Sequence, residues 1–309
     1  MILCCGEALI DMIPTPTVTG GREGFVPHSG GAVFNTAIAL GRLGVRTGML
    51  TGLSQDTFGQ QLLASLTESH VDTSHVIIAD RPSTLAFVHL KNGHATYSFF
   101  DENSAGRMLA PSDFPALLDE VSTLFFGGIS LMCEPAADAY AALLRREGSE
   151  RTVMLDPNIR PDFISGVPAY RARLNQMIAW TDIIKVSDED LRWILPGPTT
   201  LREKVEMLLE KGPSLVILTR GGEGATGYLL DGSEVTVPAA KVEIVDTVGA
   251  GDTFNAGVLA KLSELGTLEK NSLRSLSTGA LQSALQYGAK VAAIAVSRAG
   301  ANPPWIGEF

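Results

Sequence analysis

Four short apolar runs determine the fold class that we predict: TLFF at 123–126, TVML at 152–155, DIIK at 182–185 and SLVIL at 214–218. They begin 29, 30 and 32 residues apart, which is the length of a strand, a helix and their connections. Each run is apolar on both faces, as a strand of a parallel sheet covered by helices must be. We therefore predict a doubly wound α/β fold with a mostly parallel sheet flanked by helices.

The segments between these runs have the spacing of amphipathic helices. Residues 135–146 and 201–209 place apolar side chains at helical intervals. The segments share no residue pattern beyond strand and helix, so the regular interval indicates alternating elements and not an internal repeat.

The first hundred residues predict a second kind of sheet. Residues 85–89 alternate as in a strand, Asn92-Gly93 is a typical hairpin turn, and 96–99 form the returning strand. With 15–18 and 25–29 this hairpin would form a small β lid projecting from the main sheet; edge strands of the main sheet are the alternative. The expected organisation is a single domain over residues 1–309, with lid strands near 15–29 and 84–100.

Composition and charge narrow the class of protein. Hydrophobic residues make up 45% and charged residues 19% of the 309 positions, which favours a globular chain with a substantial core. A formal net charge of −10 repels polyanions, so neither nucleic acid nor an anionic membrane is an expected partner. No run of about 18 uncharged apolar residues is present. Adjacent Cys4 and Cys5 would point to opposite faces of a strand, which argues against a disulfide framework, and we expect a cytoplasmic protein.

The stretch DTVGAGDTFN at 246–255 has the form of an anion-binding turn before a helix. Gly249 and Gly251 allow a tight turn, so the N–H groups of 249–252 can converge at the start of a helix predicted over 253–265. A carboxylate there repels a ground-state phosphate, but it suits a base that accepts the proton of a hydroxyl attacking that phosphate. Asp252 is thus a candidate base; an N-capping aspartate after a glycine turn is the alternative.

A second glycine turn opens another predicted helix, GGAVFNTAIALGRLG at 30–44. Gly30 and Gly31 permit close approach by a small polar ligand, and Asn35 can both donate to and accept from hydroxyl groups. Upstream, Asp11 interrupts an apolar segment, which a pair of sugar hydroxyls would explain. An ordinary helix N-terminus is the alternative interpretation of the turn.

These two stretches resemble the signature regions of the ribokinase-like (PfkB-type) carbohydrate kinases, and the resemblance extends over nearly the whole chain. It implies that family's fold with a β lid, a sugar as substrate, and ATP and Mg²⁺ as cofactors. By resemblance, Asp252 is the catalytic base, and Gly249, Ala250 and Gly251 form the anion hole. The sugar-binding residues would be Asp11, Gly30, Gly31, Asn35, Phe87, Phe99, Asp101 and Arg160. An exposed lid also offers a surface for a homodimer.

Further segments resemble the family's nucleotide and metal sites. DPNIRP at 156–161 is similar to its Asp-Pro-Asn-x-Arg segment, and KVSDED at 185–190 stands where these kinases commonly have Asn-x-x-Glu near magnesium. Ser187 and Asp190 depart from that pattern, so Asp190 would reach Mg²⁺ through water. The implied nucleotide-binding residues are Asn158, Lys185, Thr219, Gly221, Gly222, Gly224 and Gly288, the last on a small-residue helix face against adenine. The positions similar to a monovalent cation site, with K⁺ as the candidate ion, are Asp246, Val248, Ala295 and Gly300.

Other classes of protein fit less well. Gly222, Gly224 and Gly227 match a dinucleotide fingerprint, but a strand and an Asp-Gly turn follow where a nicotinamide-dependent dehydrogenase needs a helix. The sequence has no Gly-x-Ser-x-Gly elbow and no Walker loop, and its histidines lack metal-ligand spacing. A non-catalytic sugar-binding protein would leave Asp252 unused.

The choice of sugar depends on the strand end near residue 101. Within the family, residues 97–109 and the start GEALID at 6–11 are most similar to bacterial fructokinases, which implies phosphorylation of fructose to fructose 6-phosphate. Ketodeoxygluconate kinases usually carry an arginine where Asp101 stands, and Asp101 would repel the carboxylate of that sugar acid. 2-Keto-3-deoxygluconate kinase and ribokinase remain alternatives, because Arg160 would favour an acid if it faces the sugar.

Overall fold

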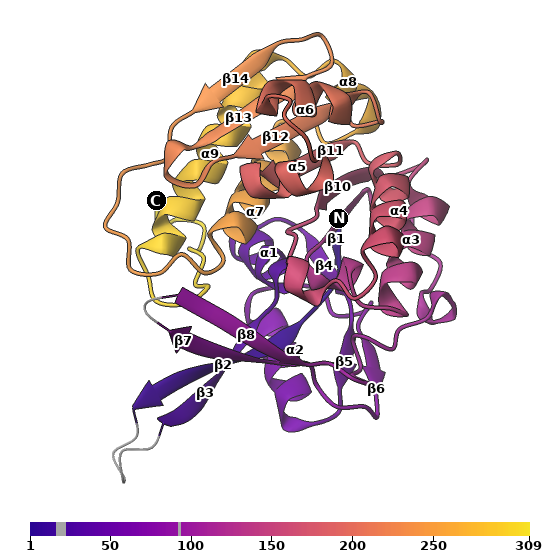
Figure 1. Cartoon of the computed structure of the whole chain (residues 1–309), viewed down its shortest axis with the longest axis vertical. Coiled ribbons are helices and arrows are strands. Elements are labelled where there is room, and N and C mark those ends of the chain that lie inside the picture. The colour runs from indigo at the N-terminus through magenta and orange to yellow at the C-terminus, as the bar shows by residue number, and fades with distance from the viewer. Residues whose placement is uncertain (17–22, 92–93) are drawn as a thin grey trace.

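An eight-stranded sheet forms the centre of the computed structural model, which describes residues 1–16, 23–91 and 94–309 (Figure 1). Six adjacent strands, β12, β11, β10, β9, β1 and β4, pair in parallel. β13 and β14 add two antiparallel strands at one edge. The order is β14 (Glu234–Val237), β13 (Ala225–Leu229), β12 (Leu215–Thr219), β11 (Ile183–Ser187), β10 (Thr152–Asp156), β9 (Thr123–Gly127), β1 (Ile2–Cys5) and β4 (Thr47–Leu50). The predicted mostly parallel sheet is confirmed.

The four runs that predicted the sheet are four adjacent strands, β9 to β12. β11 and β12 each begin one residue later than predicted, and the carboxylate of Asp182 before β11 accepts the backbone N–H of Val153 at 2.8 Å. The glycines of the dinucleotide fingerprint lie before and within β13, which continues as a hairpin into β14. No helix begins at these glycines that would present its N-terminus to a pyrophosphate, as the sequence indicated.

Helices cover both faces of the sheet and enclose two separate hydrophobic cores. One core packs under α1 (Ala32–Arg42), α2 (Thr57–Glu68), α7 (Ala250–Glu264), α8 (Lys270–Arg274) and α9 (Thr278–Val296). The other packs under α3 (Ala136–Glu147), α4 (Val167–Ile178), α5 (Asp188–Ile194) and α6 (Leu201–Leu209). Cys4 belongs to the first core and Cys5 to the second, and both thiols are free, as their alternation along β1 predicted.

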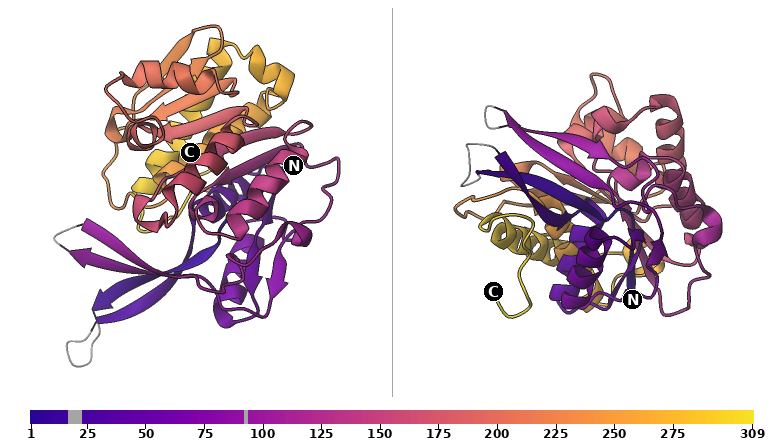
Figure 2. Two further views of the ribbon diagram at one scale, coloured as in Figure 1. Left: turned by 45° about the vertical axis from the view of Figure 1, so that its right-hand side comes forward. Right: turned by 90° about the horizontal axis from the view of Figure 1, so that it is seen from below.

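A second, four-stranded sheet projects from the body of the molecule (Figures 1 and 2). Its order is β3 (Glu23–Gly30), β2 (Leu9–Pro16), β7 (Leu85–Lys91) and β8 (His94–Phe100). These strands form a sheet of their own and are not edge strands of the main sheet, and the predicted pairing of β7 with β8 is confirmed. The Asn92-Gly93 turn and residues 17–18 lie outside the described residues. A short parallel pair, β5 (Gly52–Ser54) and β6 (Ile77–Ala79), lies apart from both sheets.

Strand register divides the side chains of this small sheet between two faces. Asp11 is paired with Ala86, which is paired with Phe99, so these three share the face toward the main body. Phe87 and Phe100 lie on the opposite face, where the Phe87 ring packs edge-on against Phe25 and Phe100 at centroid distances of 5.0 and 5.4 Å.

None of the described helices is long and apolar enough to cross a membrane.

Candidate active site

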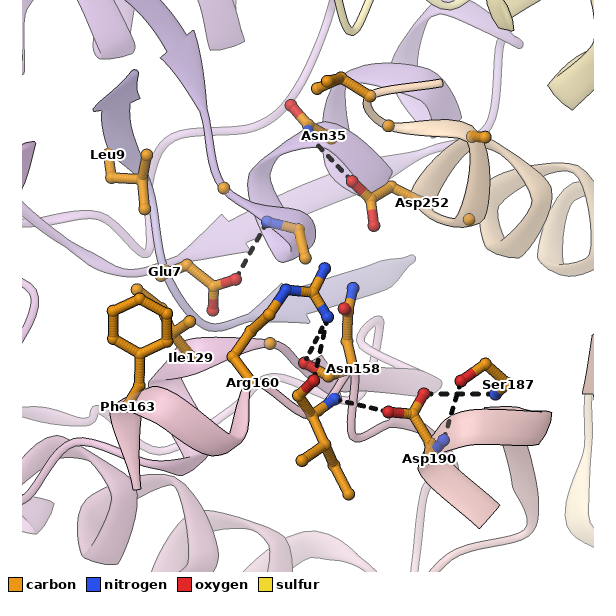
Figure 3. Close-up of a pocket in the computed structure, with 18 of the residues that line it drawn as sticks. Glu7, Leu9, Asn35, Ile129, Asn158, Arg160, Phe163, Ser187, Asp190 and Asp252 are labelled. Atoms are coloured by element: carbon orange, nitrogen blue, oxygen red, sulfur yellow. Dashed lines mark hydrogen bonds between the residues drawn. The ribbon is translucent and has the colours of Figure 1, made fainter. Parts of the chain in front are cut away.

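A cavity of about 550 Å³ opens where the carboxyl ends of the parallel strands meet the small sheet (Figure 3). In a parallel α/β sheet this edge is the usual place of a ligand site. Figure 3 shows Asn35 and Asp252 on one side, Ser187 and Asp190 on the other, and Arg160 between them. The predicted site residues that line this cavity are Asp11, Gly31, Asn35, Phe99, Asn158, Arg160, Lys185, Asp190, Val248, Gly249, Ala250, Gly251 and Asp252.

The turn before α7 has the geometry of an anion hole. Gly249 is the N-cap in a left-handed conformation, with φ 74°, and the helix begins at Ala250, three residues earlier than predicted. No acceptor among the described residues pairs with the N–H of Gly251 or of Asp252. The turn therefore presents unsatisfied donors and the positive end of a 15-residue helix to the cavity.

Asp252 is a buried carboxylate with the properties of a base near neutral pH. It is 6% exposed, and its Oδ2 accepts a hydrogen bond from Asn35 Nδ2 at 2.9 Å. Burial raises the pKa of Asp252 to about 7; the negative charges of Asp156 and Glu7 add to the rise, while Asn35 and Lys185 oppose it. The Asn35 contact joins the first turn of α1 to the first turn of α7.

The opposite wall of the cavity carries Asp11 on β2. Burial raises the pKa of Asp11 to about 6. A side chain at Gly30 would overlap the Asp11 carboxylate, so glycine there leaves room for this carboxylate. Phe99 lies nearby, and its ring packs against Phe163 at a centroid distance of 4.3 Å, which brings β8 into contact with the main body.

Asp156 organises the polar side chains at the end of β10. Its Oδ2 accepts from Lys185 Nζ at 3.0 Å and from Asn255 Nδ2 at 2.7 Å, and all three side chains are buried. Burial alone would lower the pKa of Lys185, but the carboxylates of Asp156 and Asp190 outweigh it and raise the pKa, so the ammonium stays charged. Lys185 Nζ lies 3.4 Å from where a Cβ on Gly251 would stand, which places a fixed positive charge beside the anion hole.

Asp190 lines the cavity, and each of its carboxylate oxygens accepts one backbone N–H. Its Oδ1 accepts the N–H of Ile159 at 2.9 Å, and its Oδ2 accepts the N–H of Ser187 at 3.2 Å, in a reciprocal cap of α5. Both oxygens thus hold backbone, including the loop where Asn158 adopts a left-handed φ of 43°. The described part of the chain contains no group of three or more His, Cys, Asp or Glu side chains arranged to hold a metal.

Three predicted residues are placed elsewhere by the structure. Phe87 faces away from the cavity, because strand alternation puts it opposite the face of Asp11. Asp101 lies outside the cavity lining, and its carboxylate is paired with Arg107 at 2.7 Å. Gly288 is buried where α9 crosses α7, in contact with Gly257 and Phe254, so it does not present a surface to adenine.

The remaining predicted residues surround the cavity without lining it. Thr219 ends β12, and the turn that contains Gly221, Gly222 and Gly224 follows at the same edge of the sheet. Nothing lies within 4 Å of where a Cβ at Gly221 or Gly222 would stand, so this turn is open to solvent. The Asp246 carboxylate accepts the N–H of Val248 at 3.0 Å and that of Gly300 at 2.9 Å, which brings these three positions together. Ala295 lies at the end of α9, where its carbonyl accepts the N–H of Arg298 at 3.1 Å.

Sequence reasoning missed Glu7, which lines the cavity and is only 8% exposed. It also missed the parts that Asp156 and Asn255 play in holding Lys185. A signal for Glu7 was present: a charged residue follows a strand, β1, whose residues are all buried.

Comparison with known proteins agrees with this geometry. The family model described as pfkB family carbohydrate kinase matches residues 1–306. A fructokinase of Rhizobium leguminosarum bv. trifolii is 52% identical over 283 residues, which cover 91% of this chain and 86% of the relative. The crystal structure of fructokinase with bound ATP from Xylella fastidiosa superposes with a TM-score of 0.88 at 26% identity, covering 97% of this chain and 93% of that one. A Vibrio cholerae O395 fructokinase, in its fructose, ADP and calcium ion bound form, gives 0.82 at 25% identity, covering 97% and 94%.

Proposed function

This chain belongs to the pfkB family of carbohydrate kinases, and we propose that it transfers the γ-phosphoryl group of ATP to fructose, giving fructose 6-phosphate. The observation that carries the proposal is the contact between Asp252 and Asn35, because it joins a buried base at an open helix N-terminus to the turn that would hold the sugar. A protein that only bound sugar would need neither the open turn nor a carboxylate with a pKa of about 7 beside it.

The proposed reaction follows from these positions. Asp252 accepts the proton of the sugar's terminal hydroxyl as that oxygen attacks the γ-phosphorus, and the bond to the β–γ bridging oxygen breaks to release ADP. The N–H groups of Gly251 and Asp252 and the ammonium of Lys185 stabilise the negative charge of the transferring group. Mg²⁺ would arrive on the triphosphate and neutralise part of its charge, and Asp190, which lines the cavity, would reach it through water.

The identity of the sugar rests on the curated relatives and on the shape of the cavity. Leu9, Ile129, Phe99 and Phe163 give the sugar side an apolar wall beside Asp11, which suits a neutral sugar with hydroxyls on one edge. The charge of Asp101 is not an argument for fructose, because its carboxylate forms an ion pair with Arg107. Arg160 lines the cavity, and its Nη1 donates a hydrogen bond to the carbonyl of Ile159 at 3.1 Å. If the substrate were a sugar acid, the Arg160 guanidinium would bind its carboxylate.

The test is a comparison of acceptors with one enzyme preparation. We expect kcat/KM with MgATP to be at least about tenfold higher for fructose than for ribose, 2-keto-3-deoxygluconate or a nucleoside, because a mismatched sugar leaves buried polar groups unpaired. The Asp252→Asn variant controls for contaminating kinases. A preference for ribose or ketodeoxygluconate would replace the substrate and retain the kinase, whereas activity on none of them would overturn the proposal.

The small sheet completes the proposal as a lid that excludes water from the acceptor, because Asp11 and Phe99 on its inner face line the cavity. Its outer face carries Phe25 and Phe100, 38% and 55% exposed, with Phe87 between them, and we propose this face as the surface of a homodimer. The molecular mass in solution tests it: Phe100→Ser should shift a dimer toward monomer, and a wild-type monomer at micromolar concentration would exclude it.

Two further assignments belong to the proposal. K⁺ would bind beside Asp246, Val248, Ala295 and Gly300, where Asp246 already fixes two of the backbone segments. A cytoplasmic location fits the three free cysteines, Cys4, Cys5 and Cys133. Activity in K⁺ compared with tetramethylammonium tests the first assignment.

A further inference from the structure

Glu7 is a buried carboxylate for which the proposed reaction has no use. It follows β1 and lies in the cavity wall with 8% of its surface exposed. None of the ion pairs among the described residues includes it, so no cation explains its burial. A buried acid without a counterion is retained only where hydrogen bonds stabilise it, so its donors indicate its role.

The first set of donors comes from the start of α1. Glu7 Oε1 accepts the N–H of Ala32 at 3.0 Å, and the Glu7 carbonyl accepts the N–H of Phe34 at 3.2 Å. The N-cap of this helix is Gly31, which has no side chain to serve these donors. Glu7 therefore caps α1 from another segment and fixes the turn that carries Gly31 and Asn35.

The second donor comes from the turn after β9. Glu7 Oε2 accepts the N–H of Ser130 at 3.2 Å, at the start of the 3₁₀ turn Ile129–Leu131. A side chain at Gly128 would overlap the Glu7 carboxylate, so the chain leaves room for this contact with a glycine at φ 67°. One carboxylate thus ties together three segments that each contribute a residue to the cavity wall: Glu7 itself, Gly31 and Ile129.

We propose that Glu7 is a positioning residue of the sugar site: its carboxylate holds the turn before α1 against the turn after β9, and so fixes where Gly31 and Asn35 meet the sugar. Glu7 acts through backbone N–H groups and need not touch the sugar. The effect on substrate binding is expected on the sugar side, because the open turn before α7 and Lys185 are held by other contacts, while the charge of Glu7 also adds to the raised pKa of Asp252. The choice of fructose as the measured sugar rests on the proposed function.

The test is the Glu7→Gln variant, which keeps the size of the side chain but replaces one acceptor oxygen with a donor. One of the two N–H groups then faces an amide NH₂. We expect KM for fructose to rise at least about fivefold, since a buried donor left without an acceptor is costly, while KM for ATP stays within about twofold. The control is Asp182→Asn, which changes another buried acid that accepts a backbone N–H, from Val153 at 2.8 Å; Asp182 is also paired with Lys270 at 2.7 Å, and it precedes β11 outside the cavity lining.

A purely structural role of Glu7 predicts a different pattern. Both variants would then lower the melting temperature and leave both KM values unchanged, and that result would overturn the proposal. If Glu7→Gln does not fold, amide exchange in the wild type decides: the Ala32 and Ser130 amides should be protected without ligand, and exchange at the rate of an open loop would overturn it. Wild-type activity on fructose is measured first, so a wrong sugar is recognised as a failure of the proposed function and not of Glu7.

Discussion

Helices α1 and α7 both begin at a glycine with positive φ and no capping side chain, Gly31 at 108° and Gly249 at 74°. At α1 the carboxylate of Glu7, from another segment of the same chain, accepts a hydrogen bond from the N–H of Ala32. At α7 no described residue accepts from Gly251 or Asp252, and the turn faces the cavity. A helix start without a capping side chain is therefore a joint between segments at α1, and at α7 it leaves unpaired donors that we propose bind an anion. What separates the two is whether an internal carboxylate supplies the anion.

The largest effect should come from the acid on the open turn. Asp252→Asn should lower kcat by about 10²–10⁴, because the amide cannot accept the proton of the attacking hydroxyl. ATP binding, measured by calorimetry, should stay near the wild-type value. Turnover within about threefold of wild type would mean that another residue is the base, and the start of α7 would then lose its proposed catalytic role.

Replacing a glycine by alanine at the start of each helix should distinguish the structural role of the α1 start from the proposed catalytic role of the α7 start. Gly251→Ala puts a Cβ 3.4 Å from Lys185 Nζ, an ordinary contact, so the fold should tolerate it while kcat falls about 10- to 100-fold through a displaced phosphoryl group. Gly31→Ala requires φ 108° and crowds Glu7, so it should cost about 1–3 kcal/mol of unfolding free energy. Steady-state kinetics and urea denaturation of both variants measure this. Equal loss of stability in the two would show that the turns do not differ in the way described.

The pH dependence should follow Asp252. With a pKa of about 7, the base is protonated in acid, so kcat/KM should fall about tenfold per pH unit below pH 7. Stability should change in the opposite sense: the folded pKa lies above the unfolded value, so this group favours folding below about pH 4 and that contribution is lost as pH rises toward 7. Thermal unfolding between pH 4 and 7, with Asp252→Asn as the control, tests the sign. A rate profile that is flat between pH 5 and 7 would contradict the assignment.

The smallest effect is expected at Asp101, which belongs to neither turn. Because its carboxylate is paired with Arg107 and lies outside the cavity lining, Asp101→Asn should change the preference for fructose over ketodeoxygluconate by less than about threefold. Measuring kcat/KM for both sugars decides it. A change of tenfold or more would return Asp101 to the sugar site and restore its charge as a determinant of specificity.

The fold was predictable where burial leaves a clear pattern. Strands β9 to β12 are buried on both faces, so each is a continuous apolar run between polar segments. The start of α7 was predicted three residues late, because Gly249 and Gly251 flank Ala250 and glycine has low helix propensity. The face of Phe87 depends on the register of β2 with β7, which no local pattern specifies.

The site was predictable where a motif is continuous in sequence. The turns at 30–35 and 249–252 carry their chemistry within a few residues, and both line the cavity. Asp190 was connected with magnesium through its place in the segment that resembles Asn-x-x-Glu, whereas its contact with the N–H of Ile159, 31 residues away, is a backbone contact that leaves no mark on the sequence. Glu7 was overlooked although a charged residue after a buried strand was a signal, because its contacts with the N–H groups of Ala32 and Ser130 join segments far apart in the sequence.

Because the interior is divided into two cores, the neighbouring cysteines Cys4 and Cys5 can serve as probes of the two helical layers. Cys4 and Cys5 are both fully buried, and burial raises the pKa of each thiol, so neither reacts while its side of the sheet is closed. One thiol points into each core, although a single peptide bond joins them. A pulse of alkylating reagent during denaturation therefore reports the two helical layers separately. Equal labelling rates would mean that the layers unfold as one cooperative unit, and unequal rates would identify the layer that opens first.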